Sequence, residues 1–175
     1  MITTIHASMH DQPVIDAYHS DDLRRNRAAS QSIIPVATEL AAGIGRVLPK
    51  FNGKFVAHAL RVPVNNVSAI NVTLNLAGDT SALELNQIIS DAASEHLQGI
   101  LGYTEALLAS CDFNHDTRSG IVDGTQTLVS NGSDSKASSD RGNTANLLIW
   151  FDNEWAFANR MLDLAAYLQS ARQAT

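Results

Sequence analysis

Residues 61–76, RVPVNNVSAINVTLNL, decide how the chain is expected to fold. Valine, isoleucine and threonine, which favour β-strands, are frequent in residues 67–76 and in the upstream segment 55–62. The sequence PVNN at 63–66 separates the two segments and contains turn-forming residue types. This pattern predicts two strands joined by a short connection.

The rest of the chain adds further strands and three helices to this pair. Additional strands are expected at residues 1–10, 107–113, 119–129 and 146–152. Apolar residues recur at helical spacing in residues 38–48, in 81–97 with Ser81 as the N-cap, and in 154–171. Long strands with few helices and short connections predict the α+β class: a largely antiparallel or mixed sheet with helices on one face.

Two segments lack such periodicity. Residues 11–32 are polar and irregular and contain the basic cluster RRNR at 24–27, so a functional or interface loop is expected. Residues 131–146, NGSDSKASSDRGNTAN, are predicted to form a flexible surface insert because they offer little to bury. The length of 175 residues predicts one domain, residues 1–175.

Composition excludes several classes of function. The 12 basic and 18 acidic side chains give a net charge of −6, which argues against a nucleic-acid surface. The one cysteine, Cys111, can form neither an intrachain disulfide nor a thiolate metal cluster, and no metal-ligand spacing is present. The chain shows no signal-peptide pattern and no apolar run long enough to span a membrane, so we expect a cytoplasmic protein.

Two residues at predicted strand ends could carry chemistry. His6 ends an apolar strand and could act as a general base, although a hydrogen-bonded core histidine is the more frequent meaning of such a pattern. Arg61 also lies at a strand end, where a guanidinium can hold a phosphate or form a structural ion pair. Cys111 lies in the apolar run LLASC, which favours inert packing over a nucleophilic role.

Two short polar segments also leave alternatives open. Arg24, Arg25 and Arg27 could form an anion site, a solvated face or a subunit contact. Residues 152–154, DNE, lie between a predicted strand and the last helix, where a ligand contact and a helix cap are both expected functions.

Several motifs together resemble the glyceraldehyde-3-phosphate dehydrogenase superfamily. RVPVNNVSAINVTLNL, QGILGYTE, SCDFNHDTRS and WFDNEWAFANRMLDL occur in the family's order and approximate spacing, from Met1 to about Tyr167. HASMHDQPVIDAYHSDDLRRNRAASQSIIP and IVDGTQT are closer to bacterial erythrose-4-phosphate dehydrogenases than to the glycolytic enzymes. The resemblance implies the fold of the family's C-terminal catalytic domain.

The resemblance also implies a role for each matched residue. A cysteine attacks the aldehyde, NAD accepts the hydride, and the resulting thioester is cleaved. His6 matches the base that activates the thiol, and Asn153 matches the residue that orients the nicotinamide. The matches for binding the phosphorylated sugar aldehyde are Arg61, Arg25 (with Arg24 as the alternative), and Thr38 together with the backbone of Glu39.

Departures from the family pattern refine this expectation. Met9 replaces a phosphate-binding threonine, Glu39 replaces a small residue beside Thr38, and Ala156 replaces a glycine. In the family, the Gly-rich dinucleotide motif and the catalytic cysteine precede the segment that Met1 matches, while Cys111 matches a structural cysteine. We therefore expect a catalytic-domain fragment that is inactive alone.

The function expected for the complete enzyme is NAD-dependent oxidation of erythrose 4-phosphate to 4-phosphoerythronate, feeding pyridoxal phosphate synthesis. The resemblance implies a tetramer, with the face of the sheet opposite the helices meeting a partner subunit. A glyceraldehyde-3-phosphate dehydrogenase domain is the nearest alternative. A non-catalytic assembly or interaction domain is the alternative from another class.

Overall fold

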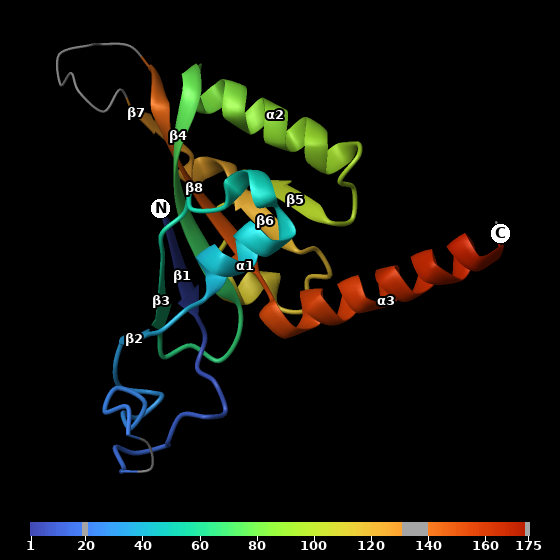
Figure 1. The fold of residues 1–175 in the computed structure, drawn as a ribbon. Coiled ribbons are helices and arrows are strands. Elements are labelled where there is room, and N and C mark those ends of the chain that lie inside the picture. Colours follow the sequence, from blue (N-terminus) through green and yellow to red (C-terminus); the bar gives the residue numbers. More distant parts are fainter. Residues whose placement is uncertain (19–20, 131–139, 174–175) are drawn as a thin grey trace.

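The computed structural model describes residues 1–18, 21–130 and 140–173, and within these ranges the strands form one eight-stranded sheet (Figure 1). The strand order is β2-β3-β1-β4-β8-β6-β5, and β7 also pairs with β8. The strands are β1 (Ile2–His6), β2 (Ile34–Val36), β3 (Ala57–Arg61), β4 (Ser68–Ser81), β5 (Leu101–Thr104), β6 (Gly120–Asp123), β7 (Leu128–Ser130) and β8 (Arg141–Phe151).

The long antiparallel pair β4 and β8 forms the centre of the sheet. Its register runs from Ser68 opposite Phe151 to Ser81 opposite Arg141, with an irregularity between Asn75 and Thr80. β1 pairs antiparallel with β4 but parallel with β3, and β5 pairs parallel with β6. The sheet is therefore mixed, which confirms the predicted α+β class.

Two helices, α1 (Leu40–Val47) and α2 (Ala82–Ser94), supply apolar side chains to the main core. The core contains Ile2, Val72 and Leu147, one residue from each of three adjacent strands. Leu40 and Ile44 of α1 and Ile89 of α2 pack against it. The predicted cap is confirmed: Ser81 accepts a hydrogen bond from the Glu84 amide, and the Glu84 side chain accepts one from the Ser81 amide.

The third helix, α3 (Asn153–Gln173), starts directly after β8 and projects away from the sheet (Figure 1). Its predicted amphipathic pattern is not matched by burial, since large apolar side chains along it are exposed. These are Phe157, Met161, Leu162, Leu164, Tyr167 and Leu168. No helix in the described ranges is long and apolar enough to cross a membrane.

A second, smaller core holds the segment that precedes β6. The Phe113 ring stacks on Trp150 with 5.7 Å between centroids and 13° between planes. Val67 and Ile121 complete this cluster, and both are almost fully buried. The packing fixes the chain just before His115, which contacts Asp152 and Trp155 at the start of α3.

One predicted strand is wrong. Within residues 107–113, Ser110–Phe113 form a short 3₁₀ helix, η2, and Cys111 is exposed. The run LLASC contains no β-branched residue, and the Asp112 carboxylate accepts a hydrogen bond from the Ala109 amide, which stabilises a local turn. The strand nearest to this segment is β5, which ends at Thr104 and was not predicted. β2 was not predicted either.

The end of the predicted insert is also wrong. β8 begins at Arg141, so residues 141–146 belong to the sheet, and Ala145 has no exposed surface. Polar residues fit this strand because they have cross-strand partners: Asn146 exchanges hydrogen bonds with Asn71 and donates to Thr73. Residues 131–139 of the predicted insert lie outside the described residues.

Candidate active site

Strand register places His6 beside Arg61. In the parallel pair of β1 and β3, His6 is the direct partner of Arg61, and both are the last residues of their strands. Side chains of directly paired residues lie on the same face of a sheet. The two residues singled out at predicted strand ends therefore meet at one edge of the sheet, on the face that carries Ile2 and the main core.

The His6 ring is half-buried and held on two sides. Ser68 Oγ lies 3.2 Å from His6 Nδ1, and the Phe151 ring meets the imidazole edge-on at a centroid distance of 6.0 Å. Burial and the nearby Arg61 charge lower the pKa of His6, while Glu154 opposes them. The neutral imidazole, which can accept a proton, is therefore favoured.

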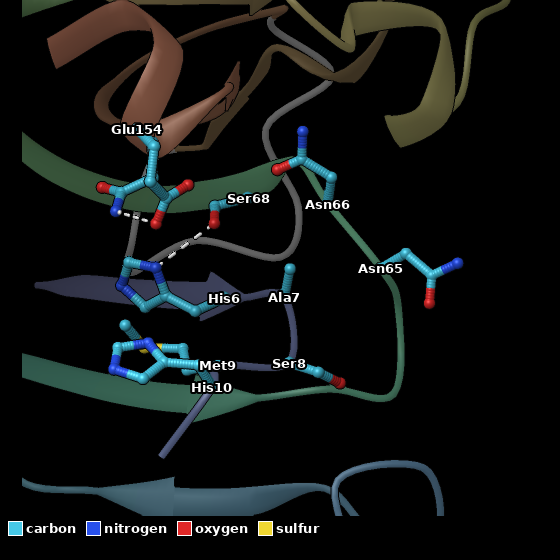
Figure 2. Close-up of a pocket in the computed structure, with 10 residues that line it drawn as sticks. His6, Ala7, Ser8, Met9, His10, Asn65, Asn66, Ser68 and Glu154 are labelled. Carbon is cyan, nitrogen blue, oxygen red and sulfur yellow. Dashed lines mark hydrogen bonds between the residues drawn. The ribbon is translucent and has the colours of Figure 1, made fainter. Parts of the chain in front are cut away.

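A pocket of about 290 Å³ opens beside this ring (Figure 2). In this view Ser68 and Glu154 lie on one side of the imidazole, while Met9 and His10 lie on the other. Small-molecule sites measure about 300–1,000 Å³, so the pocket suits a small substrate and not a whole dinucleotide. Its walls are His6, Ala7, Ser8, Met9, His10, Asn65, Asn66, Ser68, Asn153 and Glu154.

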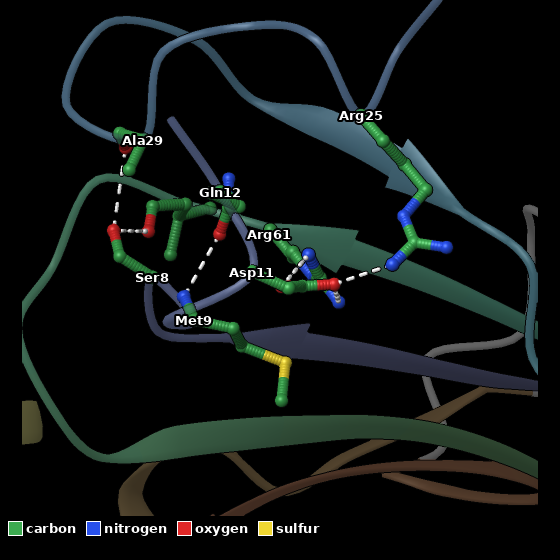
Figure 3. Close-up of polar contacts among 8 residues, drawn as sticks. Ser8, Met9, Asp11, Gln12, Arg25, Ala29 and Arg61 are labelled. Atoms are coloured by element: carbon green, nitrogen blue, oxygen red, sulfur yellow. Dashed lines mark hydrogen bonds and ion pairs between the residues drawn. The ribbon is translucent and has the colours of Figure 1, made fainter. Parts of the chain in front are cut away.

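Arg61 and Arg25 share one carboxylate, that of Asp11 (Figure 3). Arg61 Nη1 donates to Asp11 Oδ1 at 2.8 Å, and its Nη2 donates to Oδ2 at 3.4 Å. Arg25 Nη2 donates to the same Oδ2 at 2.7 Å. Burial would raise the pKa of the Asp11 carboxyl, but hydrogen bonds from the two arginines hold it below its usual value.

Asp11 was missed by sequence reasoning. It is a single acidic residue in a polar loop, and no periodic pattern marks it. Its one available signal is its position between His6 and the basic cluster at 24–27. Of the two arginines that the family resemblance offered, Arg25 shares Asp11 with Arg61, whereas Arg24 lines a different pocket.

Thr38 and Glu39 are not brought to the His6 pocket. Thr38 lines the same pocket as Arg24 and His58, at the edge formed by β2 and β3. Its hydroxyl accepts a hydrogen bond from the Leu40 amide at 3.2 Å, and Glu39 precedes the first turn of α1. Their predicted role as a second anion site stays a prediction.

Asp152 fixes the start of α3 and so the position of Asn153. Its carboxylate, only 2% exposed, accepts hydrogen bonds from the amides of His115 at 2.9 Å and Trp155 at 3.1 Å. Asn66 Nδ2 donates to it at 2.8 Å. Burial would raise the pKa of Asp152, but these hydrogen bonds lower it. The expected helix cap is confirmed for Asp152, and Asn153 lines the pocket, where its ligand contact stays a prediction.

Val67 has an unusual backbone in the middle of this site. Its φ is 65°, in the left-handed region that β-branched residues rarely adopt. It stands between Asn66, which contacts Asp152, and Ser68, which contacts His6. The buried Val67 side chain packs with Phe113 and Ile121, and this packing holds the strained backbone in place.

The residues present fit one end of a nicotinamide cofactor. Asn153 shares the pocket with His6, and its Nδ2 donates to Glu154 Oε1 at 3.0 Å, which leaves the amide oxygen as an acceptor. A side-chain amide of this kind can orient the carboxamide of a nicotinamide. Ala156, the substituted family glycine, is buried in the first turn of α3.

The thiol required by the expected mechanism does not face His6. Cys111 is exposed and lines a separate pocket with Ser110 and Asn114. Within the described ranges, no group of three His, Cys, Asp or Glu side chains is placed to hold a metal ion. The described residues therefore include an imidazole, a pair of arginines that share Asp11, and a side-chain amide.

A comparison with known protein families matches most of the chain. The family described as glyceraldehyde 3-phosphate dehydrogenase, C-terminal domain, matches residues 1–153. The match covers β1 to β8, His6, both arginines of the Asp11 contact, and Asn153 as its last residue. The chain belongs to the glyceraldehyde 3-phosphate dehydrogenase C-terminal domain family.

Proposed function

We propose that this dehydrogenase catalytic domain serves an NAD-dependent enzyme that oxidises erythrose 4-phosphate to 4-phosphoerythronate. The observation that carries the proposal is the pairing of His6, which lines the pocket, with Arg61 on the neighbouring strand. A neutral imidazole beside an anion-binding guanidinium suits an aldehyde that carries a phosphate. Family membership supports the dehydrogenase chemistry.

His6 moves the proton in this reaction. In its neutral form the ring can take the proton of the attacking thiol and return it to the substrate oxygen, which becomes a hydroxyl. The ring is then neutral again and can take the hydroxyl proton when the carbon is oxidised. Since Cys111 lies apart from His6, the thiol comes from outside these 175 residues. Asn153 orients the nicotinamide, and NAD supplies the acceptor for the hydride.

Two substituted positions support a hydrolytic outcome. Met9 presents a thioether to the pocket where a phosphate-binding hydroxyl would otherwise be expected. Glu39 places an exposed carboxylate beside Thr38, which disfavours a free phosphate at that position. Water is then the acceptor of the acyl group, as 4-phosphoerythronate formation requires.

We also propose that the complete enzyme is a homo-oligomer that uses the sheet face opposite α1 and α2. Residues 70, 72 and 74 pack with the main core, so their neighbours Asn71 and Thr73 point to the opposite face. The exposed apolar residues of α3 support further contact with other polypeptide. Sedimentation of the complete enzyme tests the assembly, and a monomer at all concentrations contradicts it.

The test of function compares two aldehydes and two acceptors. The complete enzyme bearing these residues is assayed with erythrose 4-phosphate and with glyceraldehyde 3-phosphate, each with and without inorganic phosphate. We expect preferred oxidation of erythrose 4-phosphate, independent of phosphate, and no turnover by the 175-residue chain alone. Phosphate-dependent oxidation of glyceraldehyde 3-phosphate as the preferred reaction contradicts the proposal. Inactivity of the complete enzyme with both aldehydes favours an assembly domain.

A further inference from the structure

The shared contact of Asp11 uses the face of Arg61 that an anion would use. Both terminal nitrogens of Arg61 donate to the two oxygens of the carboxylate, at 2.8 and 3.4 Å. The Arg61 side chain is only 13% exposed, so few of its donors face solvent. Guanidinium groups bind carboxylate and phosphate with the same forked geometry. Asp11 therefore occupies the place where oxygens of a phosphate would bind.

A phosphate and Asp11 cannot share this place. Both are negative, and juxtaposing like charges in a partly buried site is strongly unfavourable. The Asp11 carboxylate also reduces the charge of the arginine pair from two positive charges to one. Binding of a phosphate at Arg61 requires the carboxylate to leave first.

The loop around Asp11 allows this exchange. The turn is held by Gln12, whose amide donates to the Met9 oxygen at 3.0 Å and whose side-chain oxygen accepts from the Met9 amide at 2.8 Å. The Ser8 hydroxyl anchors the turn to the carbonyls of Ala29 and Val62. None of these bonds uses the Asp11 side chain, so its carboxylate can rotate outward while the turn stays in place.

We propose that Asp11 is an internal competitor for the anion site formed by Arg25 and Arg61. The Asp11 carboxylate binds both arginines when no substrate is present, and the phosphate of the substrate displaces the carboxylate from them. The sugar part of a sugar phosphate gains further contacts in the His6 pocket, and these offset the free energy needed to displace Asp11 from the arginines. Free inorganic phosphate has no such contacts. Asp11 is thus a specificity-determining residue that keeps inorganic phosphate from the site. This inference rests on the proposed function, because it takes a sugar phosphate as the ligand.

The test measures inorganic phosphate binding to the 175-residue chain by titration calorimetry, with the Nε–Hε signals of Arg25 and Arg61 followed by NMR. Asp11→Asn removes the charge and nearly keeps the shape, and we expect it to bind phosphate at least about tenfold more tightly than the wild type. Asp11→Ala should show the same gain. Adding Arg61→Leu to Asp11→Asn should abolish it.

Asp16→Asn is the matched control. Asp16 lies in the same loop and pairs with an arginine, Arg27, but this pair is more exposed and includes neither Arg25 nor Arg61. An equal gain in this variant shows a general effect of net charge and overturns the proposal. So does weaker, unchanged or undetectable phosphate binding by folded Asp11→Asn.

These outcomes are separable from those of the proposed function. If Asp11→Asn binds phosphate tightly but the complete enzyme does not oxidise erythrose 4-phosphate, the function fails and the competition stands. If the enzyme is active and Asp11→Asn shows no gain, only the role of Asp11 fails.

Discussion

Ser68 Oγ lies 3.2 Å from His6 Nδ1, and this contact joins the start of β4 to the end of β1. Ser68 is only 4% exposed, so water does not readily replace it as a partner. A hydrogen bond at one ring nitrogen determines which tautomer is present and how the ring is oriented. Ser68 is therefore a positioning residue for the proposed base.

Ser68→Ala should loosen this arrangement. In the complete enzyme, losing one neutral hydrogen bond is expected to lower kcat about three- to tenfold, with little change in KM. The ¹⁵N shifts of the His6 ring in the 175-residue chain should move as the tautomer populations change. Ser68→Thr keeps a hydroxyl and serves as the control. Unchanged kcat together with unchanged ring shifts would remove Ser68 from the mechanism.

The stability of the chain should fall as the pH drops below the ordinary His6 pKa of 6.5. Because burial and Arg61 lower the pKa of His6 in the folded state, the unfolded state binds its proton more readily between the two pKa values. The free energy of unfolding therefore rises with pH through that window and falls on acidification. Urea unfolding from pH 8 to pH 5 measures this slope.

His6→Gln is the matched variant for that measurement, because it cannot titrate there. Its slope between pH 7 and pH 5 should be smaller than that of the wild type. The carboxyls with lowered pKa values, such as Asp11 and Asp152, lose their stabilising effect only at more acidic pH. Identical slopes in both proteins would show that His6 protonates equally well in the folded chain.

Arg61→Leu should impair use of the phosphorylated substrate more than binding of NAD. Losing a charge-assisted contact to phosphate costs about 1.5–3 kcal/mol, or roughly ten- to a hundredfold in kcat/KM for erythrose 4-phosphate. The KM for NAD should change little, since Asn153 is the proposed nicotinamide contact. Steady-state kinetics of the complete enzyme provide the readout. A normal kcat/KM would return Arg61 to the role of a structural ion-pair partner of Asp11.

Asp152→Ala should be the most destabilising of these changes. It leaves the His115 and Trp155 amides without their acceptor and removes one of the two acceptors of Asn66 Nδ2, at a cost of about 1–3 kcal/mol for each buried group left unpaired. Chemical unfolding followed by circular dichroism measures the loss. The control is Asp163→Ala, whose ion pair with Arg160 on α3 is more exposed and should be worth at most about 1 kcal/mol. Equal effects would contradict a capping role.

Much of the fold could be predicted because local sequence patterns determine where several of its strands and helices begin and end. The strand at 67–76 and the cap at Ser81 follow from residue types and short-range hydrogen bonds. The run at 107–113 was misassigned because a short apolar segment fits a strand or a turn equally well. Residues 141–146 look like a loop because their polar side chains find partners only across the sheet.

The site was predictable only where a family motif marked a residue. Pattern alone left His6 and Arg61 as separate candidates, since their adjacency depends on the register of a parallel pair formed by segments distant in the chain. Asp11 has no sequence signal, because its importance comes from two arginines that approach it from different segments. Thr38 was grouped with them by resemblance, but its hydroxyl bonds the start of α1 in another pocket.

The left-handed backbone of Val67 limits which amino-acid substitutions this position can accept during evolution. Glycine would suit a φ of 65° but would leave the cluster of Phe113 and Ile121 without its side chain. Alanine would keep the strain and lose part of the packing. Neither Asn66 nor Ser68 would hold its present direction if that backbone relaxed. Random mutagenesis should therefore find position 67 among the least tolerant of the chain, although its side chain takes no part in any chemical step.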